Sequence, residues 1–292
     1  MFIFMIALAA FYGVSCEREA GHGVMKLSIT DAPIDTTGLE GVYITINEIQ
    51  VHTTDAGWQT LDEFEGPKTF NLLDLTRGIT EELGDFKLEG GNYTQIRFIL
   101  DAVEQDHNPQ SNPGCYLAFR DESTQPLFVP SGAQSGFKAV GEFMVPVNDT
   151  IKLTADFDVR KSVIKAGNSG KFILKPTIRV IAEGEAGQIR GNVTNIADST
   201  EVVVYAYSDA TYKDEESADP EEGKVRFPNA VSNDVVDSLG VYHIAYLAAG
   251  TYDLIVTTLV DDKFSEVLGV VEDVVVESRK TTHCDIDIAG LK

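Results

Sequence analysis

The chain has 292 residues and a mass of 31.8 kDa, enough for about two ordinary domains. It is 43% hydrophobic and 24% charged, a balance that excludes a disordered tail and a polytopic membrane protein. Lys and Arg number 23 against 46 Asp and Glu, giving a net charge of -23. Such a surface repels a phosphate backbone, so we expect no nucleic-acid partner.

The first fifteen residues, MFIFMIALAAFYGVS, carry no charge and have the length and character of the apolar part of a signal peptide. They are too short to span a membrane comfortably as a helix. We therefore expect an exported protein with a signal peptide at 1–15 and a polar tether at 16–23.

The residues around Cys16 resemble a bacterial lipobox, because the small residues Gly13, Val14 and Ser15 precede it. The resemblance implies that Cys16 becomes the first residue and carries a diacylglycerol and palmitate, which anchor the protein to the envelope, at the outer membrane. The alternative is a signal peptide cut elsewhere, with Cys16 an incidental thiol.

From residue 24 onward, apolar and polar residues alternate in short runs broken by Gly, Asp, Asn and Pro, which predicts β-strands. Only 75–86 has near-helical spacing and is predicted as a short helix. The small polar run 182–188 predicts a domain linker. Strands are predicted at 24–30, 42–53, 93–100, 137–147, 151–159 and 172–183.

The second half repeats this pattern in seven shorter runs, the count expected of a small Greek-key sandwich. The predicted fold is therefore all-β, with two Greek-key-type β-sandwich domains in tandem at 24–183 and 187–292. The seven predicted strands lie at 189–195, 202–208, 225–232, 241–247, 251–259, 265–277 and 282–288.

Residues 24 to about 183 resemble the bacterial lipoprotein domain called domain of unknown function 4382. This resemblance implies an all-β envelope domain of Gram-negative bacteria with no established activity. The residues that carry it are LSITDAPID (27–35), Gly57-Trp58, NLLDL (71–75), LEGGNYTQIRFIL (88–100), LTADFDVRKSV (153–163) and FILKPTIRVI (172–181).

Residues 187–259 resemble the transthyretin-like β-sandwich found beside carboxypeptidases as a regulatory domain. Three segments carry this resemblance: GQIRGNVTN (187–195), VVVYAY (202–207) and DSLGVYHIAYLAAGTYDLIV (237–256). An Asp-x-x-Gly turn feeds a strand that contains Tyr, and a Gly-Thr-Tyr turn returns the chain. The resemblance implies an architecture and not a ligand.

The chain has no G-x-S-x-G elbow, P-loop, dinucleotide fingerprint or H-E-x-x-H motif, so we expect no catalysis and no cofactor. Asp156 and Asp158 lie two apart on one predicted strand and face the same side, where their oxygens could hold calcium. The favoured alternative is an ordinary solvated strand face. Asp31 and Asp35 raise the same question, with a turn around Pro33 as the favoured reading.

Trp58 is the single tryptophan and is interpreted first as a core anchor, with glycan stacking as the alternative. Cys115 and Cys284 fall one in each predicted domain and could form a disulfide in an oxidising compartment. The acidic run 213–224 is predicted to be an exposed, mobile loop.

The preferred function is a non-catalytic, membrane-anchored binding or scaffold module for a glycan, ion or protein partner. A first alternative is a fimbrillin-like subunit of a surface fibre, built by strand addition with 282–291 as the detachable strand. A second alternative is a hydrolase whose site is assembled from distant residues.

Overall fold

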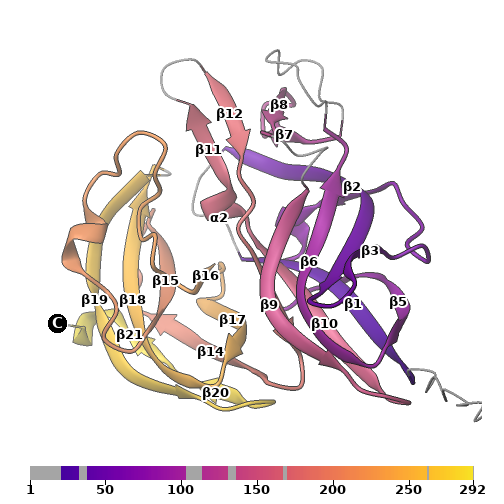
Figure 1. The fold of residues 1–292 in the computed structure, drawn as a ribbon. Coiled ribbons are helices and arrows are strands. Elements are labelled where there is room, and N and C mark those ends of the chain that lie inside the picture. The colour runs from indigo at the N-terminus through magenta and orange to yellow at the C-terminus, as the bar shows by residue number, and fades with distance from the viewer. Residues whose placement is uncertain are drawn as a thin grey trace, which may run out of the picture.

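The computed structural model describes residues 21–32, 38–102, 114–130, 136–166, 170–261 and 263–291. The described chain is almost entirely β-structure and forms two domains that lie side by side (Figure 1). The predicted all-β sandwich fold is confirmed. The signal peptide at 1–15 and Cys16 lie outside the described residues, and no helix within those residues is long and apolar enough to cross a membrane.

The N-terminal domain contains thirteen of the described strands and two short helices. They are β1 (His22–Ala32), β2 (Leu39–Thr53), β3 (Gly57–Thr60), β4 (Lys68–Asn71), the 3₁₀ helix η1 (Leu72–Asp74), β5 (Glu81–Glu89), β6 (Gly91–Leu100), β7 (Tyr116–Phe119), β8 (Thr124–Phe128), β9 (Phe137–Val145), β10 (Thr150–Asp158), α2 (Val159–Ser162), β11 (Val163–Ala166), β12 (Lys171–Leu174) and β13 (Ile178–Ala182).

These strands form one continuous path, β11-β12-β8-β7-β2-β6-β9-β13-β10-β1-β5, with β3 and β4 both paired to β2. β1 and β10 run parallel, with Thr30 opposite Asp156 and Ala32 opposite Asp158. Parallel neighbours are usually covered on both faces, and both of these strands carry long buried runs. One face of the β1–β10 pair packs into the core of the N-terminal domain. The C-terminal ends of β1 and β10 lie against the second domain.

The C-terminal domain contains two four-stranded sheets. Their paths are β17-β14-β20, with β21 also on β14, and β16-β15-β18-β19. The elements are β14 (Ala186–Thr194), β15 (Glu201–Ser208), the 3₁₀ helix η4 (Asp214–Ser217), β16 (Ser232–Val235), β17 (Val241–Ala248), β18 (Gly250–Val260), β19 (Lys263–Val276), β20 (Thr281–His283), β21 (Ile286–Asp287) and the 3₁₀ helix η5 (Ile288–Gly290).

The β16-β15-β18-β19 sheet has a buried cluster on each of its two faces. One cluster lies between the two sheets of the domain and includes Val204 and Leu254. The other, which includes Tyr205 and Ile255, is covered by the segment that contains Phe227. Successive residues of a strand point to opposite faces of the sheet. Both faces of β15 are covered, so β15 is apolar nearly throughout.

The predicted helix at 75–86 is wrong. The segment forms the loop after η1 and then β5, in which Leu83 and Phe86 are both buried. The pairing of β1 with β5 shifts between Leu27 and Ser28, and Leu27 lies opposite Gly84. A bulge adds one residue to the strand, so two inward side chains are three positions apart and mimic helical spacing.

The predicted strand at 225–232 is also wrong, because β16 begins only at Ser232. Phe227 has a positive φ of 54° and is fully buried, so its backbone cannot continue a strand. The segment 282–291 contains β20 and β21, which pair in parallel with β14 and complete their own sheet. The predicted strand 172–183 is two strands, β12 and β13, and β3, β4, β5, β7, β8 and β11 were not predicted. The remaining described strands follow the predicted ones closely.

The predicted linker at 182–188 is shorter in the structure. A turn at residues 183–185 separates β13 from β14, and the Glu185 amide donates to the Ala182 carbonyl over 2.9 Å. The predicted tether also ends earlier, since β1 begins at His22. The domains are therefore joined by a tight turn.

Candidate functional site

Arg77, in the loop between η1 and β5, binds the second domain through four contacts. Its Nε lies 2.8 Å from Asp234 Oδ2, and its Nη1 lies 2.9 Å from Asp237 Oδ2. Its Nη2 donates to the backbone carbonyls of Val235 (3.2 Å) and Val241 (2.6 Å). Burial lowers the pKa of Arg77, but the two aspartates outweigh this effect and raise it, so the guanidinium stays charged.

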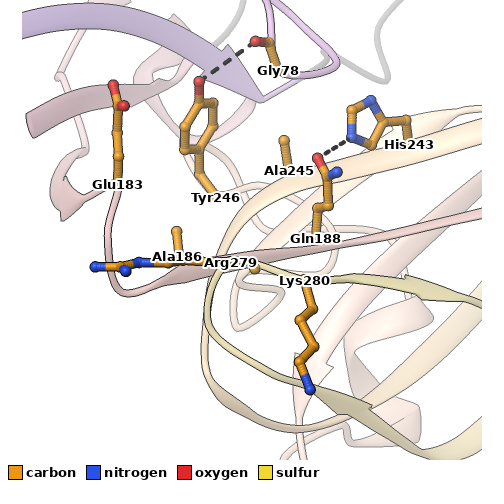
Figure 2. A pocket seen from close by; sticks show the side chains of 10 residues that line it. Gly78, Glu183, Ala186, Gln188, His243, Ala245, Tyr246, Arg279 and Lys280 are labelled. Atoms are coloured by element: carbon orange, nitrogen blue, oxygen red, sulfur yellow. Dashed lines mark hydrogen bonds between the residues drawn. The ribbon is translucent and has the colours of Figure 1, made fainter. Parts of the chain in front are cut away.

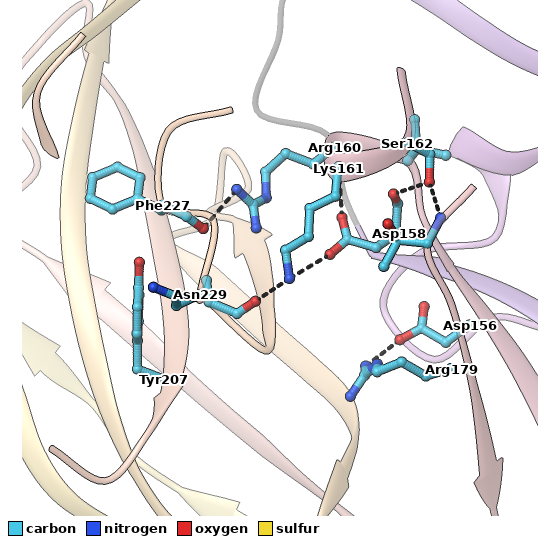
Figure 3. A network of polar contacts seen from close by, with 12 residues as sticks. Asp156, Asp158, Arg160, Lys161, Ser162, Arg179, Tyr207, Phe227 and Asn229 are labelled. Atoms are coloured by element: carbon cyan, nitrogen blue, oxygen red, sulfur yellow. Dashed lines mark hydrogen bonds and ion pairs between the residues drawn. The ribbon is translucent and has the colours of Figure 1, made fainter. Parts of the chain in front are cut away.

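Helix α2 supplies two further cations to the same junction (Figure 3). Arg160 is 3% exposed, and its Nη1 donates to the carbonyls of Arg226 (2.6 Å) and Phe227 (3.0 Å). Lys161 Nζ donates to the carbonyl of Ala230 over 2.6 Å. Together with Arg77, three cations of the N-terminal domain reach five backbone carbonyls of the C-terminal domain.

Asp156 and Asp158 are both buried at this junction, so the favoured interpretation of a solvated strand face is wrong. The second domain covers the end of β10, which a pattern within one strand does not reveal. Asp156 pairs with Arg179. Asp158 accepts from the Lys161 amide over 3.1 Å as the N-cap of α2 and pairs with Lys161 Nζ at 3.1 Å.

Asp31 is a third buried carboxylate in this region, and it is 4% exposed. Its Oδ1 accepts from the Val159 amide over 2.9 Å, while its Oδ2 has no hydrogen-bond partner. Burial raises the pKa of Asp31 well above its usual range, and the negative charges of Asp156 and Asp158 raise it further. Asp35, the other residue of this predicted turn, lies outside the described residues.

Within the described residues, no group of three or more His, Cys, Asp or Glu side chains is arranged to hold a metal ion. The calcium prediction at Asp156 and Asp158 therefore gains no third carboxylate ligand from this part of the chain. Each of these two carboxylates instead has a basic partner, Arg179 or Lys161.

A pocket of about 300 Å³ opens at the junction (Figure 2). Its walls come from Gly78 of the N-terminal domain, Glu183 of the linking turn, and Gln188, His243 and Tyr246 of the C-terminal domain. Pockets of this size at domain interfaces are common small-molecule sites. The pocket is formed by both domains, so it exists only while they are docked.

Tyr246 reaches the pocket because of a bulge in β17. The pairing of β14 with β17 shifts between Gly187 and Ile189, and Tyr246 has a positive φ of 55°. Such bulges re-aim side chains next to functional sites. The Tyr246 ring lies along one wall, and its hydroxyl is 3.5 Å from the Gly78 carbonyl of the other domain (Figure 2).

The charges on the pocket walls nearly balance. Glu183 contributes a carboxylate and Arg279 a guanidinium, whose Nε donates to the Gly184 carbonyl over 2.8 Å. Lys280 also lines the pocket, but its Nζ pairs with Glu277 at 2.6 Å and points away from the cavity in Figure 2. The pocket therefore offers donors and acceptors without a strong net charge.

His243 adds a neutral ring to the pocket. Burial lowers its pKa, and the positive charges of Arg190 and Arg77 lower it further. Its Nε2 lies 2.7 Å from Gln188 Oε1, and this hydrogen bond holds the two side chains together. At neutral pH His243 therefore presents an uncharged aromatic edge to the pocket.

Trp58 lies on β3 and is half-buried and not part of the core cluster. The Arg97 guanidinium covers its ring at 3.7 Å from the centroid, and Lys138 Nζ lies at 5.6 Å. The favoured core-anchor interpretation is therefore wrong. The face that a sugar would stack on is occupied by Arg97.

Cys115 and Cys284 are both free thiols in the structure. Cys115 is fully buried in the core of the N-terminal domain, and burial raises its pKa to about 12. Cys284 lies between β20 and β21 on the C-terminal domain, and its carbonyl accepts from the Tyr242 hydroxyl over 2.6 Å. The predicted disulfide is not formed, because each thiol belongs to the packing of its own domain.

Sequence reasoning missed the junction residues Arg77, Arg160, Lys161, Asp234 and Tyr246. The one available signal was the Asp-x-Asp-x-Arg-Lys run at 156–161, where several charges follow an apolar strand. Burial of these charges depends on the second domain.

The fold and its junction define an all-β protein of two docked sandwich domains. The family model described as Domain of unknown function (DUF4382) matches residues 22–176, more than half of the chain, and the chain therefore belongs to this family. The matched range holds Arg77, Arg160 and Lys161 and ends before the linking turn. No curated protein matches the sequence.

Several solved structures are similar to the chain at low identity. The minor pilin GBS52 of Streptococcus agalactiae is 15% identical, with coverage of 90% of this chain and 94% of that one and a TM-score of 0.21. The shaft pilin SpaA of Lactobacillus rhamnosus GG is 11% identical, with coverage of 90% and 96% and a TM-score of 0.24.

The Bacillus anthracis TIE protein is 13% identical, with coverage of 91% of this chain and a TM-score of 0.21, and this chain spans only 34% of its length.

Proposed function

We propose that the protein is a non-catalytic lipoprotein of a Gram-negative envelope, anchored through an acylated Cys16 at the outer membrane, that binds a glycan in the pocket between its two domains. The apolar run at 1–15 and the small residues before Cys16 support the anchor. In this proposal the C-terminal domain is a transthyretin-like, carboxypeptidase-regulatory-like sandwich that supplies most of the pocket wall.

A neutral, hydroxyl-rich ligand fits the chemistry of the pocket. Sugar hydroxyls can donate hydrogen bonds to the Glu183 carboxylate and accept hydrogen bonds from the Arg279 guanidinium. The C–H faces of a sugar pack on aromatic rings such as that of Tyr246. A strongly anionic ligand is disfavoured because Lys280 is already paired with Glu277.

The observation that carries this proposal is that both domains contribute walls to the pocket. Polar contacts between the domains hold these walls in fixed positions. Gly78 and Tyr246 face each other across the junction, and Arg77 immediately precedes Gly78. A rigid pocket loses little entropy when a ligand binds, so a few polar contacts are enough for specificity.

The binding claim is tested by calorimetric titration of the full chain, purified in mild detergent, with a panel of neutral oligosaccharides. We expect one member to bind at a single site and Gln188→Ala to weaken it by about fivefold, since a lost hydrogen bond to the ligand contributes about 1 kcal/mol. The control is Gln59→Ala, which changes an exposed glutamine on β3. A panel without a binder, or equal affinity in both variants, contradicts the proposal.

The anchor is tested separately by the intact mass of the protein extracted from its own membranes. We expect the signal peptide to be absent and the N-terminal Cys16 to carry acyl chains. In a Cys16→Ser variant, the acyl mass and membrane association should both be lost. Retention of the membrane-bound form by this variant contradicts acylation at Cys16.

The fibre-subunit alternative requires a terminal strand that can leave its sheet. The Asn192 amide donates to Asp285 Oδ1 over 2.8 Å, and the Cys284 amide donates to the Arg190 carbonyl over 3.0 Å. The strand is therefore tied to β14 of its own domain, which favours a binding module over a subunit built by strand exchange. The hydrolase alternative gains no support from His243, whose ring bonds to Gln188.

A further inference from the structure

The start of β1 is held between two turns at one end of the N-terminal domain. The Gly90 amide donates to the Gly21 carbonyl over 2.7 Å, and the Asn148 amide donates to the His22 carbonyl over 2.8 Å. Gly90 lies between β5 and β6, and Asn148 lies between β9 and β10. The first described residues are therefore fixed to the rigid domain at this end, at the bottom of the domain in Figure 1.

Two large apolar side chains are exposed at this same end. Met144 is 62% exposed near the end of β9, and Val147 is 53% exposed in the turn that follows. Val147 packs over two glycines: a Cβ added at Gly21 would lie 2.3 Å from Val147 Cγ1, and one added at Gly90 would lie 2.4 Å from Val147 Cγ2. Both glycines are needed for this close approach, which holds Val147 beside the start of β1.

The short connection to Cys16 limits where this end can lie. Only five residue steps separate Cys16 from Gly21, and a fully extended chain of that length spans at most about 18 Å. If Cys16 is acylated, as proposed above, Gly21 lies within about 18 Å of the lipid headgroups. The Met144–Val147 end is then the part of the described domain closest to the bilayer.

We infer that Met144 and Val147 contact the bilayer and seat this end of the N-terminal domain on a zwitterionic lipid surface. This inference rests on the proposed anchor at Cys16. The exposed charged residues beside the two apolar side chains are mostly acidic, with Glu89, Glu142 and Asp149 against Lys152, so an anionic headgroup surface would repel this end. Two apolar side chains cannot anchor a protein alone, so their contact orients a protein that the acyl chains already hold.

The test uses the full acylated chain in vesicles of phosphatidylcholine and phosphatidylethanolamine, with Cys284→Ser removing the half-buried thiol. An environment-sensitive fluorophore is attached at Val147→Cys. The matched control is Val260→Cys, because Val260 is an exposed valine at the far end of β18 from the linking turn. We expect emission at position 147 to rise at least about twofold on reconstitution and to be quenched by lipid-borne quenchers, as for a side chain in the interface.

The result that overturns the inference is a vesicle-bound protein in which both positions stay equally accessible to a water-soluble quencher. That outcome leaves the anchor intact. A protein that does not remain with the vesicles overturns both the anchor and the membrane contact, so the two failures are distinguishable.

Discussion

Arg77 and Asp234 form an ion pair between the two domains, with Nε and Oδ2 2.8 Å apart. The Asp234 side chain is almost fully buried, and its Oδ2 also accepts from the His243 amide over 2.7 Å. A buried carboxylate is costly unless it is paired and hydrogen-bonded. Docking of the N-terminal domain therefore supplies the positive charge of Arg77 that pairs with the buried Asp234 carboxylate. The stability of the C-terminal domain therefore depends on its contact with the N-terminal domain.

Loss of Arg77 should destabilise the docked protein. Arg77→Ala leaves Asp234 buried without its cation and removes two bonds to backbone carbonyls, so the free energy of unfolding should fall by about 3 kcal/mol. Chemical denaturation followed by circular dichroism measures this change. Lys26→Ala is the matched control, because Lys26 and Asp85 form an exposed pair whose loss should change stability little. Equal effects of the two substitutions would contradict the assignment.

The contributions of Asp234 and Asp31 to stability should rise as the pH falls from 7.5 to 5, whereas His243, whose pKa is lowered in the fold, contributes with the opposite sign. Burial raises the pKa of Asp234 to about 6 despite Arg77, and burial likewise raises the pKa of Asp31. A carboxyl with a raised pKa in the folded state contributes stability that is complete below its unfolded pKa and is lost as the pH rises through its folded pKa.

Between pH 7.5 and 5 the Asp234 contribution is about 1.4 kcal/mol, because pH 5 lies about one unit below its folded pKa and one unit corresponds to 1.36 kcal/mol. Denaturation at a series of pH values measures this slope. In Asp31→Asn/Asp234→Asn this contribution should be absent, so acidification should favour the folded state of the variant less than that of the wild type. Equal changes of stability with pH in the wild type and the double variant would contradict the raised pKa values of these carboxyls.

The Arg160 side chain should contribute through its stem as well as its charge. Its Nε and Nη2 are buried without hydrogen-bond partners, and its guanidinium lies 5.5 Å from the Tyr205 ring centroid. Arg160→Met keeps an apolar stem in the site, whereas Arg160→Ala leaves a cavity, so the alanine variant should be less stable by about 2 kcal/mol. Thermal unfolding of both variants provides the comparison, and equal stabilities would show that the stem does not pack.

Two tyrosines should make matched contributions to the two domains. The Tyr93 hydroxyl donates to the Glu89 carbonyl over 3.1 Å, and the Tyr252 hydroxyl donates to the Ala248 carbonyl over 2.9 Å. Each bond closes a hairpin by reaching four residues back. Tyr93→Phe and Tyr252→Phe should each cost about 1 kcal/mol in denaturant titrations. If neither substitution changes stability, these hydroxyl bonds do not stabilise the turns.

Most long strands were predictable because each has its own apolar pattern, whereas the four-residue strands β3, β4, β7 and β11 are too short to show one. The alternation in β14, where Ile189 and Val193 point inward, can be seen without knowing the partner strand. The errors arose where a local pattern was altered by geometry. A bulge opposite Leu27 made Leu83 and Phe86 look helical, and the positive φ of Phe227 interrupted an apolar run.

The candidate site was not predictable, because its residues come from both domains. Asp156 looked like a solvated strand residue, since the domain that buries it begins about thirty residues later. The acidic run 213–224 looked like a mobile loop, yet Glu216 accepts from Tyr207 over 2.9 Å and from Asn229 over 2.9 Å. Contacts of this kind depend on tertiary structure and leave no periodic signal.

The most direct test of the central claim is the distance distribution between spin labels on the two domains of the full chain. Labels at Thr60→Cys on β3 and Glu266→Cys on β19, in a Cys284→Ser background, report the relative position of the domains by double electron–electron resonance. One narrow distribution is expected, and Arg77→Ala/Arg160→Ala should broaden it. A broad distribution in the otherwise unaltered protein would contradict a fixed pocket between the domains.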